Sequence, residues 1–223
     1  MPIRLVKTTD PGFKPLLEKI LERRGTRDGS IDRRVSEIIE TVRRQGDRAV
    51  LRYTARFDHV RLKLSRLEVK KSEIEAALKT LPRDDLSALR LAAERISIFH
   101  RHQLQKSWKY RDRLGITLGQ RITPLRRVGI YVPGGKALYP STVLMNAIPA
   151  KVAGVDEIIM SSPLGTDGSL LLAAAHLAGV DRIFRIGGAQ AVAAMAFGTQ
   201  TIPKVDKIVG PGNIFDVGVF SGG

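Results

Sequence analysis

Three turns rich in glycine are the parts of this chain best suited to binding chemistry. They read Pro133-Gly134-Gly135, Gly187-Gly188-Ala189 and Gly210-Pro211-Gly212-Asn213. Glycine has no Cβ, so the backbone amides of such turns can closely approach a phosphate or a ring. Ser141, just beyond the first turn, can open a helix whose N-terminus favours an anion. Any one pair of glycines equally fits a simple tight turn, but three such turns on one edge would favour a ligand site.

Short runs rich in β-branched residues precede these turns and predict the strands that position them. Strands are predicted at Val128–Val132, Glu157–Met160, Arg182–Ile186 and Lys207–Val209, and Ala-rich helices follow the first three. Their spacing of about 25 residues is the length of a strand-helix unit with short loops, which indicates a parallel sheet. In a parallel sheet the carboxyl ends of the strands share one edge, where ligands bind. The sequence therefore predicts an α/β fold that gathers the three turns into one site.

The distribution of charge divides the 223-residue chain near residue 127. Residues 1–127 hold 31 of the 37 Lys and Arg and 16 of the 22 Asp and Glu, so the net charge of +15 lies entirely there. This region is predicted to be mainly helical, because apolar residues recur at helical spacing. We expect two regions, a basic helical one at 1–127 and a strand-helix one at 128–223.

Local signals in the first region predict where its elements begin and end. Val35, Ile38 and Val42 form one helical stripe, and Gly46 is a candidate stop after it. Ser72 and Glu75 have the spacing of a capping box. Three short strands are also expected, at residues 62–64, 67–69 and 116–118.

The excess of basic residues raises the question of a polyanion partner. Basic residues are interspersed with acids along the helices, as around Arg33 and Glu37, and a single Trp accompanies them. A nucleic-acid channel usually clusters charge and adds stacking aromatics, so solvated helix faces are favoured and nucleic acid is not expected as a partner. The chain has no run of apolar residues long enough to span a bilayer and no signal-peptide pattern, so we expect a cytoplasmic protein.

Common catalytic signatures are absent. Gly135-Lys136 is followed by Ala137, which breaks the Walker-type loop, and no Gly-x-Gly-x-x-Gly follows any strand. His100 and His102 are two apart, so on a helix they point to different faces and would not chelate one ion. The chain also has no cysteine. We assign no catalytic residue and no metal ligand within this chain.

Several longer motifs resemble the histidinol dehydrogenase family. They are Gly129-Ile-Tyr-Val-Pro-Gly-Gly135 with Tyr139-Pro-Ser-Thr-Val143, Gly187-Gly-Ala-Gln-Ala191 leading into Ala194-Met-Ala-Phe-Gly198, and Val205-Asp-Lys-Ile-Val-Gly-Pro-Gly-Asn213. Upstream, the segment from Gly46 to Asp58 and the Ala92–His100 helix also resemble that family. The resemblance covers nearly the whole chain, up to about Phe215.

This resemblance implies a Rossmann-like α/β enzyme that oxidises L-histidinol to L-histidine, the last step of histidine biosynthesis. The family uses two NAD and a zinc ion and forms homodimers. Its NAD contacts map onto Tyr131, Gln190 and Asn213 of this chain. Each lies at or just beyond a strand end beside a glycine turn, although the same residues would also suit a packed aromatic and two caps.

The family continues beyond this block for about as much chain again, and that part carries the zinc ligands, the substrate contacts and an acid-base Glu-His pair. We therefore expect a truncated or frameshifted member with an incomplete Rossmann-like sheet, which supplies the NAD side and is inactive alone. Two alternatives stay open. One is a related dehydrogenase of another small alcohol, such as sulfopropanediol, and the other is a non-catalytic basic polyanion-binding protein.

Overall fold

The computed structural model describes residues 5–25, 29–134, 139–165 and 168–211. The elements, in chain order, are α1 (Phe13–Gly25), α2 (Gly29–Gln45), α3 (Asp47–Phe57), a 3-10 turn η1 (Leu64–Arg66), α4 (Lys71–Thr80), α5 (Arg83–Arg101), β1 (Trp108–Arg111), β2 (Thr117–Gln120), β3 (Arg127–Tyr131), α6 (Pro140–Val152), β4 (Glu157–Ser161), α7 (Ser169–Leu177), β5 (Arg182–Phe184), α8 (Gly188–Phe197) and β6 (Lys207–Val209).

The four strands predicted for the second region form one parallel sheet in the order β5-β4-β3-β6. The α/β fold class is therefore confirmed. β5 ends at Phe184, two residues before the predicted end. There the Arg185 N–H donates to the Leu67 carbonyl at 2.9 Å, and the Val69 N–H donates to the Ile183 carbonyl at 2.9 Å. Residues 67–69 thus cover the edge of β5 as an isolated antiparallel bridge, in place of a full strand.

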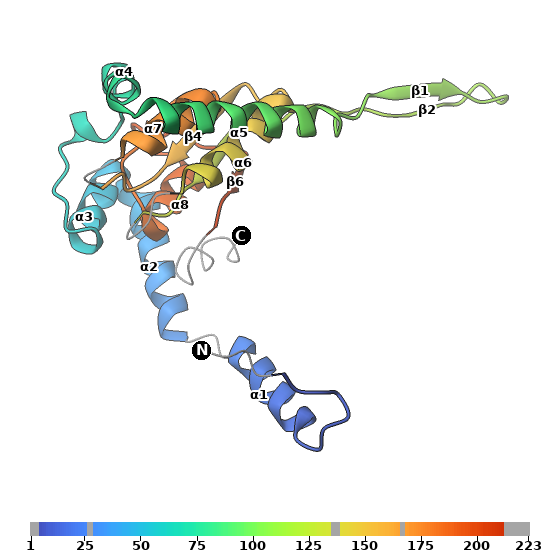
Figure 1. Cartoon of the computed structure of the whole chain (residues 1–223), viewed down its shortest axis with the longest axis horizontal. Helices are drawn as coiled ribbons and strands as arrows, with labels where there is room; N and C mark the ends of the chain where they lie inside the picture. Colours follow the sequence, from blue (N-terminus) through green and yellow to red (C-terminus); the bar gives the residue numbers. More distant parts are fainter. Residues whose placement is uncertain (1–4, 26–28, 135–138, 166–167, 212–223) are drawn as a thin grey trace.

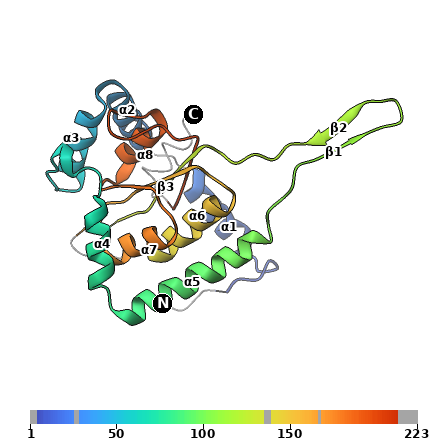
Figure 2. The same cartoon turned by 90° about the horizontal axis from the view of Figure 1, so that it is seen from above.

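Helices cover both faces of the sheet in two layers on each side (Figures 1 and 2). On one face α6 and α7 lie against the sheet, with α5 and α4 outside them. On the other face α8 lies against the sheet, with α2 and α3 outside it. The inner helices α7 and α8 are buried almost all round, at residues 171–175 and 189–195. Their alanines fit this place, because small side chains let helices pack closely between a sheet and an outer layer.

The order of the strands creates a topological switch point between β3 and β6. The chain runs from β3 through α6, β4 and α7 to β5 along one face of the sheet. It then crosses through α8 on the opposite face and places β6 beside β3. In open parallel sheets, ligands bind in the crevice at such a reversal, outside the carboxyl ends of the strands.

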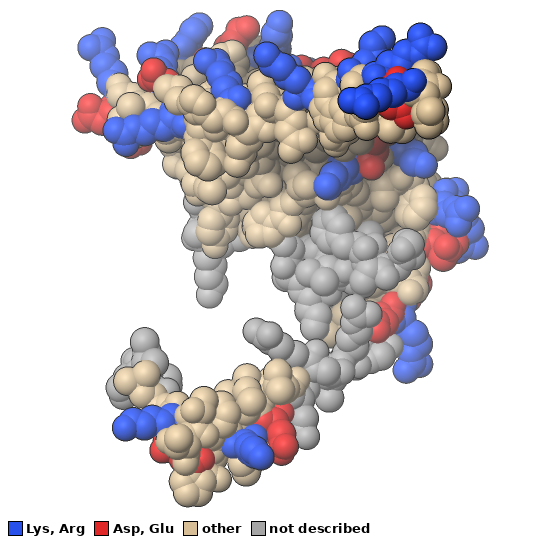
Figure 3. Space-filling view, turned by 90° about the vertical axis from the view of Figure 1, so that its right-hand side faces the viewer, with Lys and Arg blue, Asp and Glu red and all other residues tan. Residues whose placement is uncertain are grey.

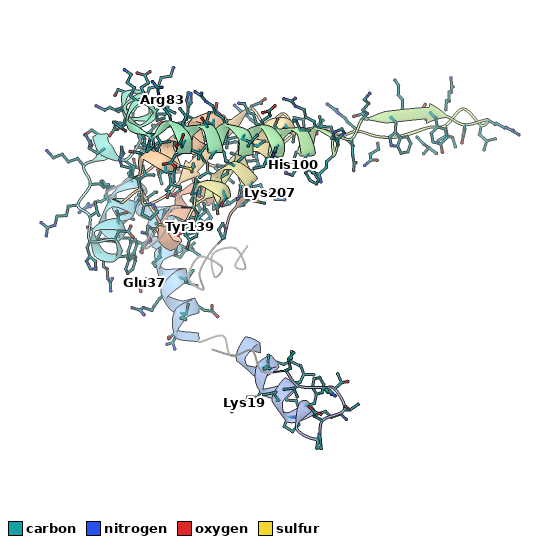
Figure 4. All side chains as sticks on the ribbon, in the orientation of Figure 1. Lys19, Glu37, Arg83, His100, Tyr139 and Lys207 are labelled. Carbon is teal, nitrogen blue, oxygen red and sulfur yellow. The ribbon has the colours of Figure 1, made fainter. Side chains whose placement is uncertain are left out.

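Two parts of the first region extend away from this layered body. Strands β1 and β2 pair as an antiparallel hairpin that projects beyond the end of α5 (Figures 1 and 2). Arg83 and His100, labelled in Figure 4, lie near the two ends of α5. Trp108 and Tyr110 of the hairpin stack at 6.2 Å and stay about half exposed. Helix α1 also lies apart from the sheet in Figure 1.

Some local predictions hold and others fail. α2 ends at Gln45, and Gly46 follows with a positive φ of 53°, as predicted. The predicted capping box is wrong: α4 begins earlier, at Lys71, and the Glu73 carboxylate accepts from the Lys70 N–H at 2.9 Å. Residues 62–64 form no strand and lead into η1, whereas 117–118 lie in β2. Of the described helices, none combines the length and apolar character needed to cross a membrane.

Candidate functional site

The carboxyl ends of β3 and β6 approach each other closely at the switch point. A Cβ built on Gly210, which follows β6, would lie 2.0 Å from the carbonyl oxygen of Tyr131 at the end of β3. Gly210 also has a φ of +145°, which residues other than glycine rarely adopt. Only glycine therefore fits at position 210. The space beside it is the crevice at the switch point, where ligands bind in folds of this kind.

Tyr131 and Gln190, two of the predicted NAD contacts, lie on either side of Gly188. The Gly188 N–H donates to the Tyr131 hydroxyl at 3.1 Å. A Cβ on Gly188, which has a φ of +67°, would lie 2.8 Å from the Gln190 Oε1. Both side chains are buried, with exposures of 3% and 1%. Both side chains therefore lie against Gly188 in the turn after β5. The third predicted residue, Asn213, lies outside the described residues.

Gln190 is an unusual buried residue, because neither polar atom of its amide has a hydrogen-bond partner among the described residues. A buried polar atom left without a partner costs about 1–3 kcal/mol. Helix caps or turn bonds would have satisfied these atoms, so capping is not what Gln190 does here. An amide kept in this state beside a glycine turn fits a ligand that supplies the missing bonds.

The Gln190 amide without a hydrogen-bond partner leads to a prediction about stability. Replacing Gln190 by Met keeps the length of the side chain and removes both unpaired atoms, so the free energy of unfolding should rise by about 1–3 kcal/mol. Urea denaturation of the two proteins measures the difference. Gln120, an exposed residue of β2, is the matched control, and Gln120→Met should leave stability nearly unchanged. A less stable Gln190→Met protein would show that the amide is bonded after all.

The two glycine turns after β3 and β5 meet over one proline. A Cβ on Gly134 would lie 2.2 Å from Pro163 Cγ, and a Cβ on Gly187 would lie 2.8 Å from the same atom. Pro163 follows β4, so the ends of three neighbouring strands touch here. The prediction that the turns gather at one edge thus holds for Gly134, Gly187 and Gly210, while residues 135–138 and 212–223 lie outside the described part.

A groove of about 890 Å³ opens from this edge toward the β5 side of the sheet. Gly134, Pro163 and Gly165 line it from the strand ends. Its opposite wall comes from the first region, through Thr54 and Asp58 at the end of α3 and through the side of α4. Thr54 and Asp58 were not among the predicted site residues, since nothing in their local pattern marks them.

The two carboxylates that line this groove, Glu73 and Asp58, have different surroundings. Glu73 accepts from Arg185 Nη2 at 2.7 Å and from Arg66 Nη2 at 3.5 Å. Burial alone would raise the pKa of Glu73, but the Lys70 N–H and the charges of Arg185 and Arg66 outweigh it and lower that pKa. For Asp58, burial dominates and raises the pKa of the carboxyl, although nearby His59 partly opposes it. Glu73 therefore serves as a fixed counter-ion of Arg185, whereas Asp58 Oδ2 has no hydrogen-bond partner among the described residues.

The described residues offer no metal site, since no three of their His, Asp or Glu side chains come together as possible ligands. They therefore do not fit the zinc ion that the family resemblance implies. Figure 3 shows one face of the molecule, on which Lys and Arg side chains are interspersed with acids and leave wide areas of other residues. On that face, Lys and Arg side chains gather along the upper edge, and Asp and Glu side chains lie among them.

Comparison with known proteins identifies the relatives of this chain. The histidinol dehydrogenase family profile matches residues 21–217. The chain is 55% identical over 216 residues to histidinol dehydrogenase of Aromatoleum aromaticum. This alignment covers 96% of this chain and 49% of that relative. It is also 55% identical to histidinol dehydrogenase of Syntrophotalea carbinolica, over 96% of this chain and 50% of that protein.

A solved structure, that of histidinol dehydrogenase from Elizabethkingia anophelis, superposes with a TM-score of 0.78 at 32% identity, over 97% of this chain and 46% of that one. The chain thus spans about half the length of the curated relatives that it matches. The resemblance drawn from the motifs is confirmed over nearly all of its length, and the chain belongs to the histidinol dehydrogenase family.

Proposed function

We propose that this chain supplies the NAD-binding side of an enzyme that oxidises L-histidinol to L-histidine, the last step of histidine biosynthesis. Two lines of support meet in this proposal. The chain belongs to the histidinol dehydrogenase family, and its sheet has a switch point that glycine turns border. Tyr131, Gln190 and Asn213 are the residues proposed to contact NAD.

The observation that carries the proposal is the unpartnered amide of Gln190 beneath the turn at the switch point. The amide offers both a donor and an acceptor, which suits a ligand with polar groups of both kinds. A Cβ on Gly134, Gly187 or Gly210 would clash with Pro163 or with the Tyr131 backbone, so glycine lets the strand ends that border the crevice pack closely together. The residues present therefore fit a dinucleotide in this crevice.

NAD supplies the acceptor for the hydride that leaves the alcohol carbon. The residues of this chain would bind and orient it. The Tyr131 hydroxyl fixes the Gly188 N–H at the start of α8, and the N-terminus of that helix favours a phosphate group.

Isothermal titration of the 223-residue chain with NAD tests this function. We expect saturable binding, which Tyr131→Phe weakens about fivefold, because the Gly188 N–H loses a hydrogen bond worth about 1 kcal/mol. Tyr110→Phe, a change in the distant hairpin, is the matched control and should leave the affinity unchanged. No binding of NAD would refute the proposal.

The same preparation should produce no NADH when L-histidinol and zinc are added. The expectation rests on the described residues, which hold no metal-ligand set, and absorbance spectroscopy measures it. Turnover would show that the residues of this chain complete an active site by themselves.

We further propose that the enzyme is a cytoplasmic homodimer. Apolar side chains of the projecting hairpin support the dimer: Trp108, Leu114 and Leu118 are 54%, 85% and 46% exposed, and exposed apolar patches commonly mark protein contacts. An isolated two-stranded hairpin is also only marginally stable, so a partner surface would help to order it.

A further inference from the structure

We propose that Ser161 is a positioning residue, whose hydroxyl fixes the orientation of the glycine turn after β5 against which Tyr131 and Gln190 lie. Ser161 is the last residue of β4 and is 0% exposed. A side chain so deeply buried acts on a ligand through the turn that it holds, without touching the ligand. The inference rests on the proposed function, because it says how the chain holds two of the proposed NAD contacts in place.

The Ser161 side chain joins β4 to the turn beyond the end of the sheet. Its hydroxyl donates to the Ile186 carbonyl at 2.7 Å, and Ile186, which directly precedes Gly187, is also 0% exposed. In the sheet, Ser161 lies opposite Phe184, the last residue of β5. Ile186 is two residues further along the chain, so the bond from Ser161 reaches past the paired strands and holds the first peptide of the turn.

This bond determines which way the peptide between Ile186 and Gly187 faces. A trans peptide is planar, and its carbonyl and its N–H point in opposite directions. Because Ser161 holds the Ile186 carbonyl, the Gly187 N–H points away from Ser161, and it donates to none of the described residues. Two successive glycines give this turn little conformational preference of its own. A tether from outside the turn is therefore needed to keep one orientation.

A second hydroxyl holds the next peptide of the same turn. The Tyr131 hydroxyl accepts from the Gly188 N–H at 3.1 Å, and Tyr131 is the residue of β3 that lies opposite Ser161. Two neighbouring strand ends thus hold two successive peptides, one through its carbonyl and the other through its N–H. Gln190 follows in the first turn of α8. Loss of either hydroxyl should therefore loosen the same turn, and the two losses should be coupled.

Amide hydrogen exchange of Gly188 in the ligand-free chain tests the tether. Ser161→Ala should speed this exchange about fivefold, because a hydrogen bond that holds the turn closed is lost. Ser162 is the matched control: it is the adjacent residue and equally buried, but its hydroxyl has no hydrogen-bond partner among the described residues. Ser162→Ala should leave the exchange unchanged. Ser161→Cys should lie between Ser161→Ala and the parent chain, because a thiol is a weaker donor than a hydroxyl.

Titration with NAD tests whether the tether serves the ligand. Ser161→Ala should weaken NAD binding about fivefold, as is expected for Tyr131→Phe. If both hydroxyls act through one turn, the double variant should lose clearly less than the product of the two effects, which is about 25-fold. Urea denaturation of the same proteins shows whether stability alone has changed. A merely structural serine would lower stability without this coupling in NAD affinity.

The two experiments separate this inference from the proposed function. Equal exchange of Gly188 in Ser161→Ala and in the parent chain would overturn the tether, whether or not NAD binds. Losses of affinity that multiply in full would show that Ser161 and Tyr131 act independently, and would overturn their joint action on the turn. Faster exchange in Ser161→Ala, in a chain that does not bind NAD, would support the tether and refute the proposed function.

Discussion

Gly210→Ala should lower the free energy of unfolding by about 3–5 kcal/mol and should abolish NAD binding. Two costs add: a φ of +145° that alanine rarely adopts, and a Cβ placed 2.0 Å from the backbone oxygen of Tyr131. Backbone atoms cannot rotate aside as a flexible side chain can, so β3 and β6 must separate. Because these two strands border the switch point, the proposed ligand crevice would be deformed with them.

Urea denaturation and NAD titration measure the two effects, and two other glycines separate their causes. Gly165 has a φ of +59° and nothing within 4 Å of the Cβ that alanine would add, so Gly165→Ala should show only the backbone cost of about 1–2 kcal/mol. Gly12 also has open space and no positive φ, so Gly12→Ala should be nearly neutral. If Gly210→Ala is no more destabilising than Gly165→Ala, then the close approach of β3 and β6 is not rigid.

Asp47→Ala should lower the free energy of unfolding by about 3 kcal/mol, because hydrogen bonds to a buried charged group contribute more than neutral ones and their loss leaves two hydroxyls without this acceptor. Asp47 is 5% exposed, and its carboxylate accepts from the Thr199 hydroxyl and, at 2.6 Å, from the Thr201 hydroxyl. The Asp47 N–H also donates to Gln200 Oε1 at 3.0 Å, so this cluster joins the start of α3 to the connection between α8 and β6.

Chemical denaturation followed by circular dichroism tests this value. Glu37, an exposed residue of α2 that Figure 4 labels, provides the control, and Glu37→Ala should change stability by less than about 0.5 kcal/mol. The loss of stability in Asp47→Asn should lie between those of Glu37→Ala and Asp47→Ala, because the amide keeps one acceptor oxygen but loses the charge. Equal stability of Asp47→Ala and the parent chain would contradict a structural role for the cluster.

The strand-helix pattern predicted the central sheet well for a physical reason. Strands buried on both faces are nearly continuous apolar runs, as residues 128–132 and 158–160 are, and small residues or proline follow them. The capping box failed because two candidate acids, Glu73 and Glu75, lie two residues apart, and the local sequence does not decide which one caps. Glu73 is selected by Arg185, which follows β5, and such a partner cannot be read from the helix.

The candidate site was predicted only in part. The gathering of the turns at Gly134, Gly187 and Gly210 follows from a parallel sheet. The contact of Tyr131 with Gly188, in the turn after β5, was not predicted. Nothing local could indicate that Gln190 would be buried without partners among the described residues, because burial depends on what packs over α8. Thr54 and Asp58 were missed for a similar reason: they lie more than one hundred residues before Pro163 in the chain, and the groove brings them together.

The parallel sheet, the edge at which its glycine turns gather and the family to which the chain belongs can all be read from the amino-acid sequence, because they follow from local periodicity, from glycine and from the order of motifs. Three other features required the folded chain: which helices cover which face, which buried polar atoms stay unpaired and which acid faces the groove. These features arise because the first region packs against the sheet. The residues in contact there are far apart in the chain, and their pairing depends on how whole elements pack.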